Sequence, residues 1–149
     1  MDNRFEIFTA LIAKIARNVK KIKNQEMAEY ELKSAPACCL YYLYTNETLT
    51  ATELCVKCEE DKATISRAIE GLEEKGYIFC DSKHTKRYKS ALYLTEKGKK
   101  VGKEIADKVN NVLDEVSVGL SERERVEFYR CLMIISDNLE SIGKHIKVD

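Results

Sequence analysis

The side chains best suited to chemistry in this chain are its thiols and its cations. Cys55 and Cys58 form a Cys-x-x-Cys pair, and Cys38 and Cys39 precede them. On one helix this spacing places both sulfur atoms on one face, as a redox couple or half of a zinc site requires. A zinc site of this kind needs a second pair, and cysteine also packs well as a small apolar residue. We therefore expect core packing for these cysteines, with a thiol- or metal-responsive site as the alternative.

The remaining reactive side chains do not form a catalytic set. His84 and His145 lack the spacing of metal ligands and are expected on the surface, whereas Cys80 and Cys131 are expected in the core. No Ser/His/Asp set, phosphate-binding loop or pair of catalytic carboxylates occurs at usable spacing. We therefore expect a protein that is not an enzyme and that uses no cofactor or metal.

Composition limits the classes of partner. The 25 basic and 25 acidic side chains cancel, so a nucleic-acid surface must come from local segregation of charge. Asp2, Arg4 and Glu6 interrupt the first residues, and no apolar run is long enough to cross a bilayer. We expect a cytoplasmic protein with no membrane partner, in which six cysteines stay as free thiols.

Cations and small polar residues gather on one face of a helix expected from Asp61 to Lys75. Asp61 is a good N-cap, and Ile65, Ala68 and Leu72 recur at the spacing of a face turned to the core. The opposite face begins with small residues and Arg67 and ends with acids, which suits a helix whose N-terminal half enters the DNA major groove. There Arg67 can bind guanine or a phosphate. With the preceding helix, the expected DNA-binding positions are Thr50, Thr52, Lys62, Ala63, Thr64, Ser66, Arg67 and Glu70.

A basic hairpin is expected directly after this helix. Gly76 ends the helix, residues 77–80 and 91–94 have strand composition, and the segment between them is rich in cations. Such a tip attracts phosphate, and an arginine on it can enter a narrow minor groove. We assign the phosphate contacts to Lys83, Lys86 and Lys89, and the minor-groove contact to Arg87.

The order helix, turn, helix and hairpin predicts a mainly α fold, a winged helix-turn-helix over residues 32–95 within a single domain of 149 residues. Segments 1–31 and 96–149 carry apolar residues at alternating spacings of three and four, typical of long helices. The chain between them has too little apolar material to cover both stripes, so we expect the two ends to form a homodimer interface. Its expected residues are Phe5, Phe8, Ile12, Ile15, Leu132, Ile135, Leu139, Ile142 and Ile146.

Three tyrosines cluster on the helix expected after Pro36. Tyr41, Tyr42 and Tyr44 lie where the winged helix part would meet the dimer helices. Aromatic packing in the core is the expected role, and the lining of a small-molecule site is the alternative.

Several short motifs occur along the central part of the chain. They are Leu49-Thr50 with Glu53-Leu54, Thr64-Ile65-Ser66-Arg67 with Leu72-Glu73, Lys75-Gly76-Tyr77-Ile78, and Arg87 before Leu94-Thr95-Glu96-Lys97-Gly98. Together these motifs resemble the multiple antibiotic resistance regulator (MarR) family. The resemblance implies a homodimeric transcription factor on a pseudopalindromic operator, with helices in successive major grooves and wings in the flanking minor grooves. It also implies release of DNA by a small ligand bound between the dimer helices and the DNA-binding part.

Two positions of the hairpin depart from the family pattern. Lys86 stands where an aspartate commonly precedes the tip arginine, and Tyr88 stands where a second arginine is common. The minor-groove role therefore falls on Arg87 alone. We expect a DNA-binding repressor that responds to a small molecule, with two alternatives: a thiol- or metal-responsive regulator that uses Cys55 and Cys58, or a winged helix module for protein contacts.

Overall fold

The structure is a computed structural model that describes residues 3–81 and 89–146. Its contacts divide the chain into two compact units, Met1–Val109 and Asn110–Asp149, which are described separately. The mainly helical architecture with one small sheet confirms the predicted fold class. The elements are α1 (Arg4–Met27), η1 (Ala28–Tyr30), α2 (Ser34–Thr45), α3 (Ala51–Cys58), α4 (Lys62–Glu74), β1 (Ile78–Cys80), β2 (Leu92–Leu94), α5 (Glu96–Val116) and α6 (Glu122–His145).

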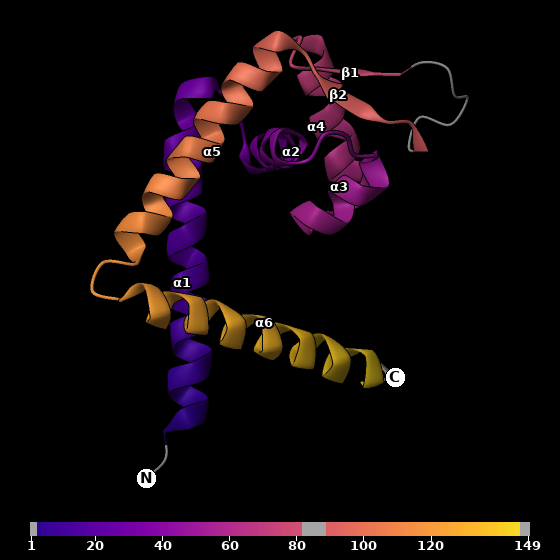
Figure 1. The fold of residues 1–149 in the computed structure, drawn as a ribbon. Coiled ribbons are helices and arrows are strands. Elements are labelled where there is room, and N and C mark those ends of the chain that lie inside the picture. Colours follow the sequence, from indigo (N-terminus) through magenta and orange to yellow (C-terminus); the bar gives the residue numbers. More distant parts are fainter. Residues whose placement is uncertain (1–2, 82–88, 147–149) are drawn as a thin grey trace. The chain divides into compact units, whose positions relative to one another are not determined.

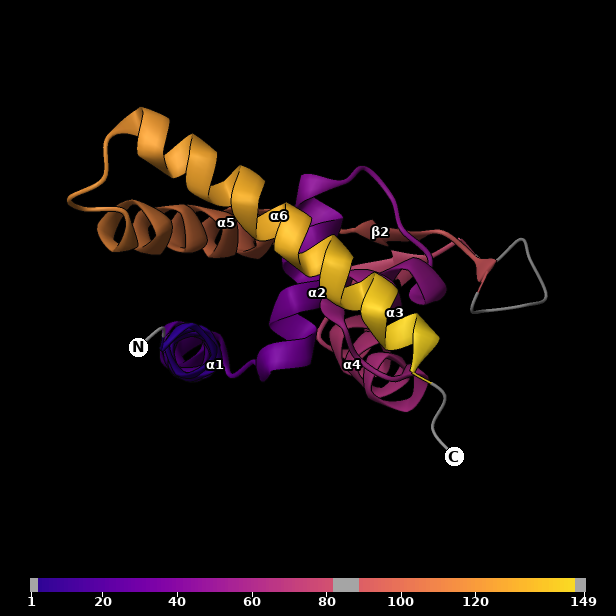
Figure 2. The ribbon, with the colours of Figure 1, turned by 90° about the horizontal axis from the view of Figure 1, so that it is seen from below.

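The core of the first unit lies among α2, α3, α4 and the hairpin. Helix α2 packs on α3, α4 and β2, and both views place the three helices together (Figures 1 and 2). Leu40, Leu54 and Ile65 have no exposed surface, and Leu72 and Leu92 have 1% each. Burial of such side chains is worth about 1.5–3 kcal/mol apiece. Helix α4 is therefore fixed by its apolar face, which leaves its polar face outward.

Local hydrogen bonds set where α3 and α4 begin. The hydroxyl of Thr50 accepts from the Glu53 amide (3.2 Å), and the Glu53 carboxylate accepts from the Thr50 amide (2.7 Å). This capping box makes Thr50 the N-cap of α3. The Asp61 carboxylate accepts from the Thr64 amide at 2.7 Å, which confirms Asp61 as the N-cap of α4.

The two-stranded sheet is antiparallel and leaves the helices as a projecting hairpin (Figure 1). Ile78 pairs with Leu94 and Cys80 with Leu92, and the Leu92 amide donates to the Leu49 carbonyl at 2.9 Å. Gly76 has φ +74°, the left-handed conformation that glycine adopts without strain and that the sequence predicted at the end of α4. Each strand begins one residue later than the sequence indicated.

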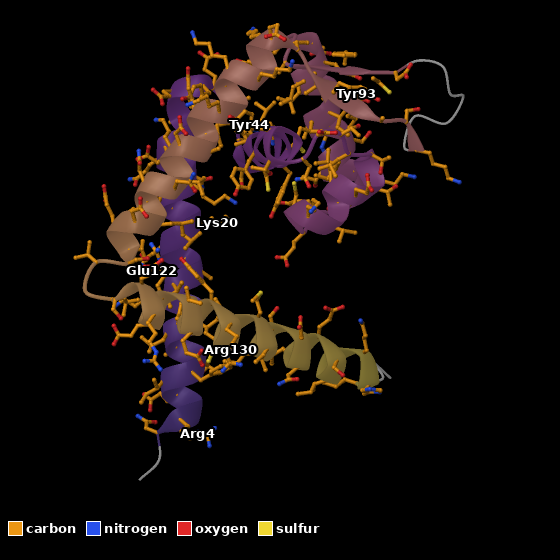
Figure 3. The ribbon with its side chains drawn as sticks, in the orientation of Figure 1. Arg4, Lys20, Tyr44, Tyr93, Glu122 and Arg130 are labelled. Atoms are coloured by element: carbon orange, nitrogen blue, oxygen red, sulfur yellow. The ribbon has the colours of Figure 1, made fainter. Side chains whose placement is uncertain are left out.

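A polar cluster joins the end of α1 and η1 to α5 within the first unit. The Tyr30 hydroxyl donates to Glu104 Oε2 at 2.9 Å, and Lys108 Nζ lies 3.4 Å from Glu26 Oε2 and also pairs with Glu29. Further along the junction, Tyr44 of α2 lies against α5 (Figure 3).

The second unit contains the end of α5 and all of α6. Gly119, with φ +93°, turns the chain, and Ser121 with Glu124 forms the capping box of α6. Asp114 and Arg125 pair at 3.9 Å across this turn. Within the described residues, no helix is both long and apolar enough to cross a membrane.

Candidate nucleic-acid interface

The polar face of α4 is exposed as the sequence predicted. Ala63, Ser66 and Glu70 are exposed, as are Lys62 and Arg67. Ile65, Ala68, Ile69 and Leu72 are buried on the opposite face, which confirms the assignment of the core side. The small side chains at the N-terminal half of α4 leave room for close approach by a base edge.

The Arg67 guanidinium is held near the start of α4. Its Nη2 lies 3.4 Å from the Thr64 hydroxyl, and Thr64 is half-buried. The Thr64 amide and hydroxyl hold the pKa of the Asp61 carboxyl below its usual value, and the charge of Arg67 adds to this effect. Arg67 therefore interacts with the N-terminal turn of its helix. This arrangement places the guanidinium at the end of α4 that would enter a groove.

The first helix of the motif contributes two threonines with different environments. The Thr50 hydroxyl is engaged in the capping box, so its contribution to α3 is structural. Thr52 lies two residues after Thr50 in the sequence and is exposed. DNA contacts by either side chain stay a prediction.

The hairpin tip is only partly described. Lys83, Lys86 and Arg87 lie outside the described residues, as does His84. Lys89 is described and exposed. On the strands, Phe79 and Tyr93 stack with ring centroids 5.4 Å apart, which stiffens the base of the hairpin.

The proposed dimer residues are mostly exposed in the single chain. Their exposure runs from 40% for Phe8 to 64% for Ile146, and Ile135 is half-buried. The side chain of Phe5 is outside the description. Exposed apolar rows of this length mark an interaction surface. Ile12, Ile15, Leu132, Leu139 and Ile142 have exposed fractions between those of Phe8 and Ile146.

The three tyrosines do not share one environment. The rings of Tyr41 and Tyr42 meet edge to face at 5.2 Å and are half-buried, and Lys57 Nζ lies 5.4 Å from the Tyr42 ring centre. Tyr44 is 39% exposed. Tyr41 and Tyr42 thus pack against the core as expected, and a ligand role for the three stays a prediction.

The cysteines were only partly assigned correctly. Cys39 is buried, and Cys55 and Cys58 are half-buried against the core. Cys80 is also half-buried, but Cys131 is exposed, so its predicted core position is wrong. Cys131 lies on α6, where no described residue is buried, so this helix gives the thiol no core to pack into.

The environment of the thiols on α2 and α3 counts against a sensitive thiol switch. Hydrogen bonding to Cys58 and then burial raise the pKa of the Cys38 thiol. A hydrogen bond with Cys38 lowers the pKa of Cys58, but a bond with Cys39 and burial outweigh it and raise this pKa to about 12. Protonated thiols are poor nucleophiles and poor metal ligands. Across the described ranges, no group of three or more His, Cys, Asp or Glu residues is placed to hold a metal ion.

A cavity of about 530 Å³ lies between α3, α4 and β2. The sequence analysis did not predict it, because its walls come from three elements that no local pattern relates. Its lining includes two predicted DNA-binding hydroxyls and one cation. The lining residues are Ala51, Thr52, Cys55, Lys62, Ile65, Ser66, Ile69 and Leu92.

Comparison with known proteins agrees with this geometry. A sequence model described as MarR family matches residues 30–87. An uncharacterized HTH-type transcriptional regulator of Bacillus subtilis, YybA, is 27% identical over 137 residues, which are 91% of each chain. The crystal structure of the transcriptional regulator SlyA aligns with a TM-score of 0.80 and 26% identity over 94% of this chain and 99% of that one. The S. aureus MepR–DNA complex shares the fold, with a TM-score of 0.76 and 19% identity over 89% of this chain and 97% of that one. The match to the MarR family model spans the helix-turn-helix, and the likeness in fold to transcriptional regulators spans nearly the whole chain, so in sequence and in fold this chain is similar to MarR family regulators.

Proposed function

We propose that the protein is a transcriptional repressor that binds a pseudopalindromic DNA operator as a homodimer and is released by a small molecule. The observation that carries the proposal is the exposed face of α4, where Ala63, Ser66 and Arg67 stand outward from a buried apolar face. The MepR structure of the same fold is a complex with DNA, which supports this role for the helix. A homodimer presents two such helices related by a two-fold axis, and so favours a symmetric operator.

The direct test is the loss of DNA affinity in an Arg67→Ala variant. Duplexes selected from a random library are titrated with the protein by fluorescence anisotropy at two salt concentrations. Loss of a base or phosphate contact by arginine should weaken binding about 10- to 100-fold. Lys99→Ala is the matched control, because Lys99 is an exposed cation of α5 that pairs with Glu96 at 2.9 Å, outside this face.

The wing is tested in the same assay with Arg87→Ala and Lys89→Ala. Loss of a phosphate contact should weaken binding on all duplexes alike and reduce the salt slope by about one unit per cation removed. Parental affinity in both the Arg67→Ala and the Arg87→Ala variants would reject the proposed binding surface. If no duplex is bound at low salt, the chain is instead a winged helix module for protein contacts.

The homodimer is proposed from the apolar rows of α1 and α6. Leu139 is 51% exposed in the single chain, a poor environment for an aliphatic side chain in the middle of such a row. A Leu139→Glu variant should shift the protein to a monomer in light scattering after size exclusion. Asn138→Glu adds the same charge at the neighbouring exposed position and should stay dimeric. A parental molar mass equal to one chain would reject the dimer.

The effector is proposed to bind where the terminal helices meet the winged helix part. Tyr41, Tyr42 and Tyr44 are the candidate lining residues, since all three are at least partly accessible. Ligands that lower DNA affinity in the parent should lose that effect in a Tyr42→Ala variant if the assignment is right.

A further inference from the structure

Helix α1 carries a run of cations that no acidic residue interrupts. Residues 7–25 contain five cations and no aspartate or glutamate. Because the basic and acidic side chains of the whole chain are equal in number, the rest of the chain is net acidic. Helix α4, by contrast, has three glutamates but only two cations, Lys62 and Arg67. Electrostatic attraction of phosphate therefore depends on cations outside α4.

Four of the cations lie on one side of α1 and are called the α1 basic face. This face consists of Lys14, Arg17, Lys20 and Lys21. All four side chains are exposed, and Lys20 is labelled in Figure 3. Among the residues that the structure describes, none of the four pairs with a carboxylate. At about 100° per residue they lie opposite the apolar row through Ile12, Ile15 and Val19.

The spacing of these cations suits a row of phosphates. Lys14 and Lys21 are about 10 Å apart along α1, at roughly 1.5 Å of rise per residue. Each strand of a duplex carries about one negative charge per 3.4 Å of its axis, so about three phosphates of one strand face this length. Lysine and arginine bind phosphate by charge-assisted hydrogen bonds from flexible stems. The face can therefore make about two to three phosphate contacts at once.

A bilayer surface fits this helix less well than a nucleic acid does. An interfacial helix inserts its apolar row between the lipids and keeps its cations at the headgroups, so it needs both faces. In the proposed homodimer the apolar row of α1 is covered, and the cations on the opposite side stay accessible. Cations without an available apolar row match a polyphosphate.

We propose that the α1 basic face binds the phosphates of duplex DNA without sequence preference, as a second DNA surface apart from α4 and the hairpin. Charge complementarity carries the proposal, since the face combines four exposed cations with no neighbouring acid. The bound DNA is either the flank of an operator or a separate segment, because the phosphates of both are alike. The choice of DNA over lipid rests on the proposed homodimer, whereas contact with phosphate does not require an operator.

The test replaces all four cations of the α1 basic face with glutamine, which has nearly the same helix propensity. Affinity for a long duplex without an operator is measured by anisotropy over a range of salt. The face variant should bind at least about tenfold more weakly at low salt and should lose about two units of salt slope. A control variant removes the same charge by replacing four exposed cations of α5 and α6 with glutamine, and it should lose less than about one unit. The control positions are Lys99, Lys103, Arg130 and Lys144.

Parental affinity in the face variant, or an equal loss in the face and control variants, would overturn the proposal. Circular dichroism and light scattering check that the face variant keeps the helix content and association state of the parent. If it does not, a variant with only Lys20→Gln and Lys21→Gln replaces it and should lose about one unit of salt slope. A parental slope in this smaller variant would overturn the proposal in the same way.

Operator binding separates this proposal from the proposed function. Arg67→Ala should weaken operator binding and leave the effect of the face variant on operator-free DNA unchanged, because sites that share no partner act additively. If selection yields no operator, the proposed function fails, yet loss of operator-free DNA by the face variant still supports the second surface. A parent that binds no duplex at low salt would overturn both.

Two further measurements identify the source of the DNA. If the face variant weakens only operators with long flanks, the α1 basic face binds flanking DNA. If the parent complex takes up a second duplex in light scattering and the face variant complex does not, the face binds a separate segment. Either result supports the proposal. A face variant that keeps its DNA affinity but no longer binds phosphatidylglycerol vesicles would overturn it in favour of a membrane surface.

Discussion

Replacing Gly98 with alanine tests how closely α5 approaches the segment that follows the recognition helix. A Cβ at Gly98 would lie 1.9 Å from the Tyr77 carbonyl oxygen, 2.9 Å from its carbonyl carbon and 3.2 Å from Leu94 Cδ2. The Tyr77 carbonyl is fixed because it accepts from the Thr95 amide at 3.0 Å. The Thr95 hydroxyl in turn accepts from the Gly98 amide at 3.0 Å. The added methyl group therefore meets backbone that cannot move without breaking these contacts.

The magnitude follows from three terms. Overpacking against fixed neighbours costs about 1–3 kcal/mol. Disrupting the Thr95–Tyr77 hydrogen bond costs about 1 kcal/mol more. Alanine returns about 1 kcal/mol through its higher helix propensity. The net loss is about 2 kcal/mol, which for a chain of this size lowers Tm by roughly 4–8 °C.

Urea unfolding followed by circular dichroism measures this loss. Parent and variants need equal chain concentrations, because association of the chains contributes to apparent stability. Gly71→Ala is the control, because a Cβ at Gly71 in α4 has nothing within 4 Å and should stabilise by about 0.5–1 kcal/mol. If Gly98→Ala is as stable as the parent while Gly71→Ala behaves as expected, the close approach of α5 to Tyr77 is refuted.

Three further outcomes follow from local contacts. Thr50→Ala should lower stability by about 1 kcal/mol in urea because it removes the capping box, whereas Thr50→Ser should keep it. Hydrogen bonds from the Thr50 amide and then from the Thr50 hydroxyl lower the pKa of Glu53, so their stabilisation is present above the unfolded pKa and is lost as the pH falls through the folded pKa; Thr50→Ala removes only the hydroxyl's part. Acid titration of stability should therefore show a weaker fall in Thr50→Ala than in the parent. Tyr30→Phe removes the hydrogen bond to Glu104 and should cost about 1 kcal/mol. Burial raises the pKa of Tyr30 and also that of Tyr42, so the parent should show one more late-ionising tyrosine than this variant in alkaline absorbance titration.

The sequence predicted the recognition helix well because its signals are local. The cap at Asp61 and the buried row through Ile65 and Leu72 depend on residues three or four apart. The same holds for the capping box at Ser121 and for the turn at Gly76. Bounds differed by a residue where hydrogen bonding, rather than composition, decides the end of a strand.

The features that the sequence did not predict depend on residues far apart in the chain. The need for glycine at position 98 comes from Tyr77, and the cavity joins Leu92 to helices that begin near position 51. Cys131 was placed in the core from its residue type, whereas no described residue of α6 is buried in the single chain. The approach of Gly98 to Tyr77 and the cavity at Leu92 each join residues more than four positions apart, so no local sequence pattern predicts them.

The apolar periodicity of the terminal helices predicts buried faces that a single chain does not bury. The apolar rows of α1 and α6 predicted two long helices, and both helices form. Yet Ile15 and Ile142 are each more than half exposed, whereas Leu40 and Ile65 in the winged helix core are not exposed at all. At about 25 cal/mol per Å² of apolar surface, rows of this length would contribute many kcal/mol if covered. A second copy provides identical rows, so the homodimer proposed above would remove them from water. On that proposal, a Leu139→Glu monomer should retain the fold of its helix-turn-helix while losing the two-fold arrangement that a symmetric operator requires.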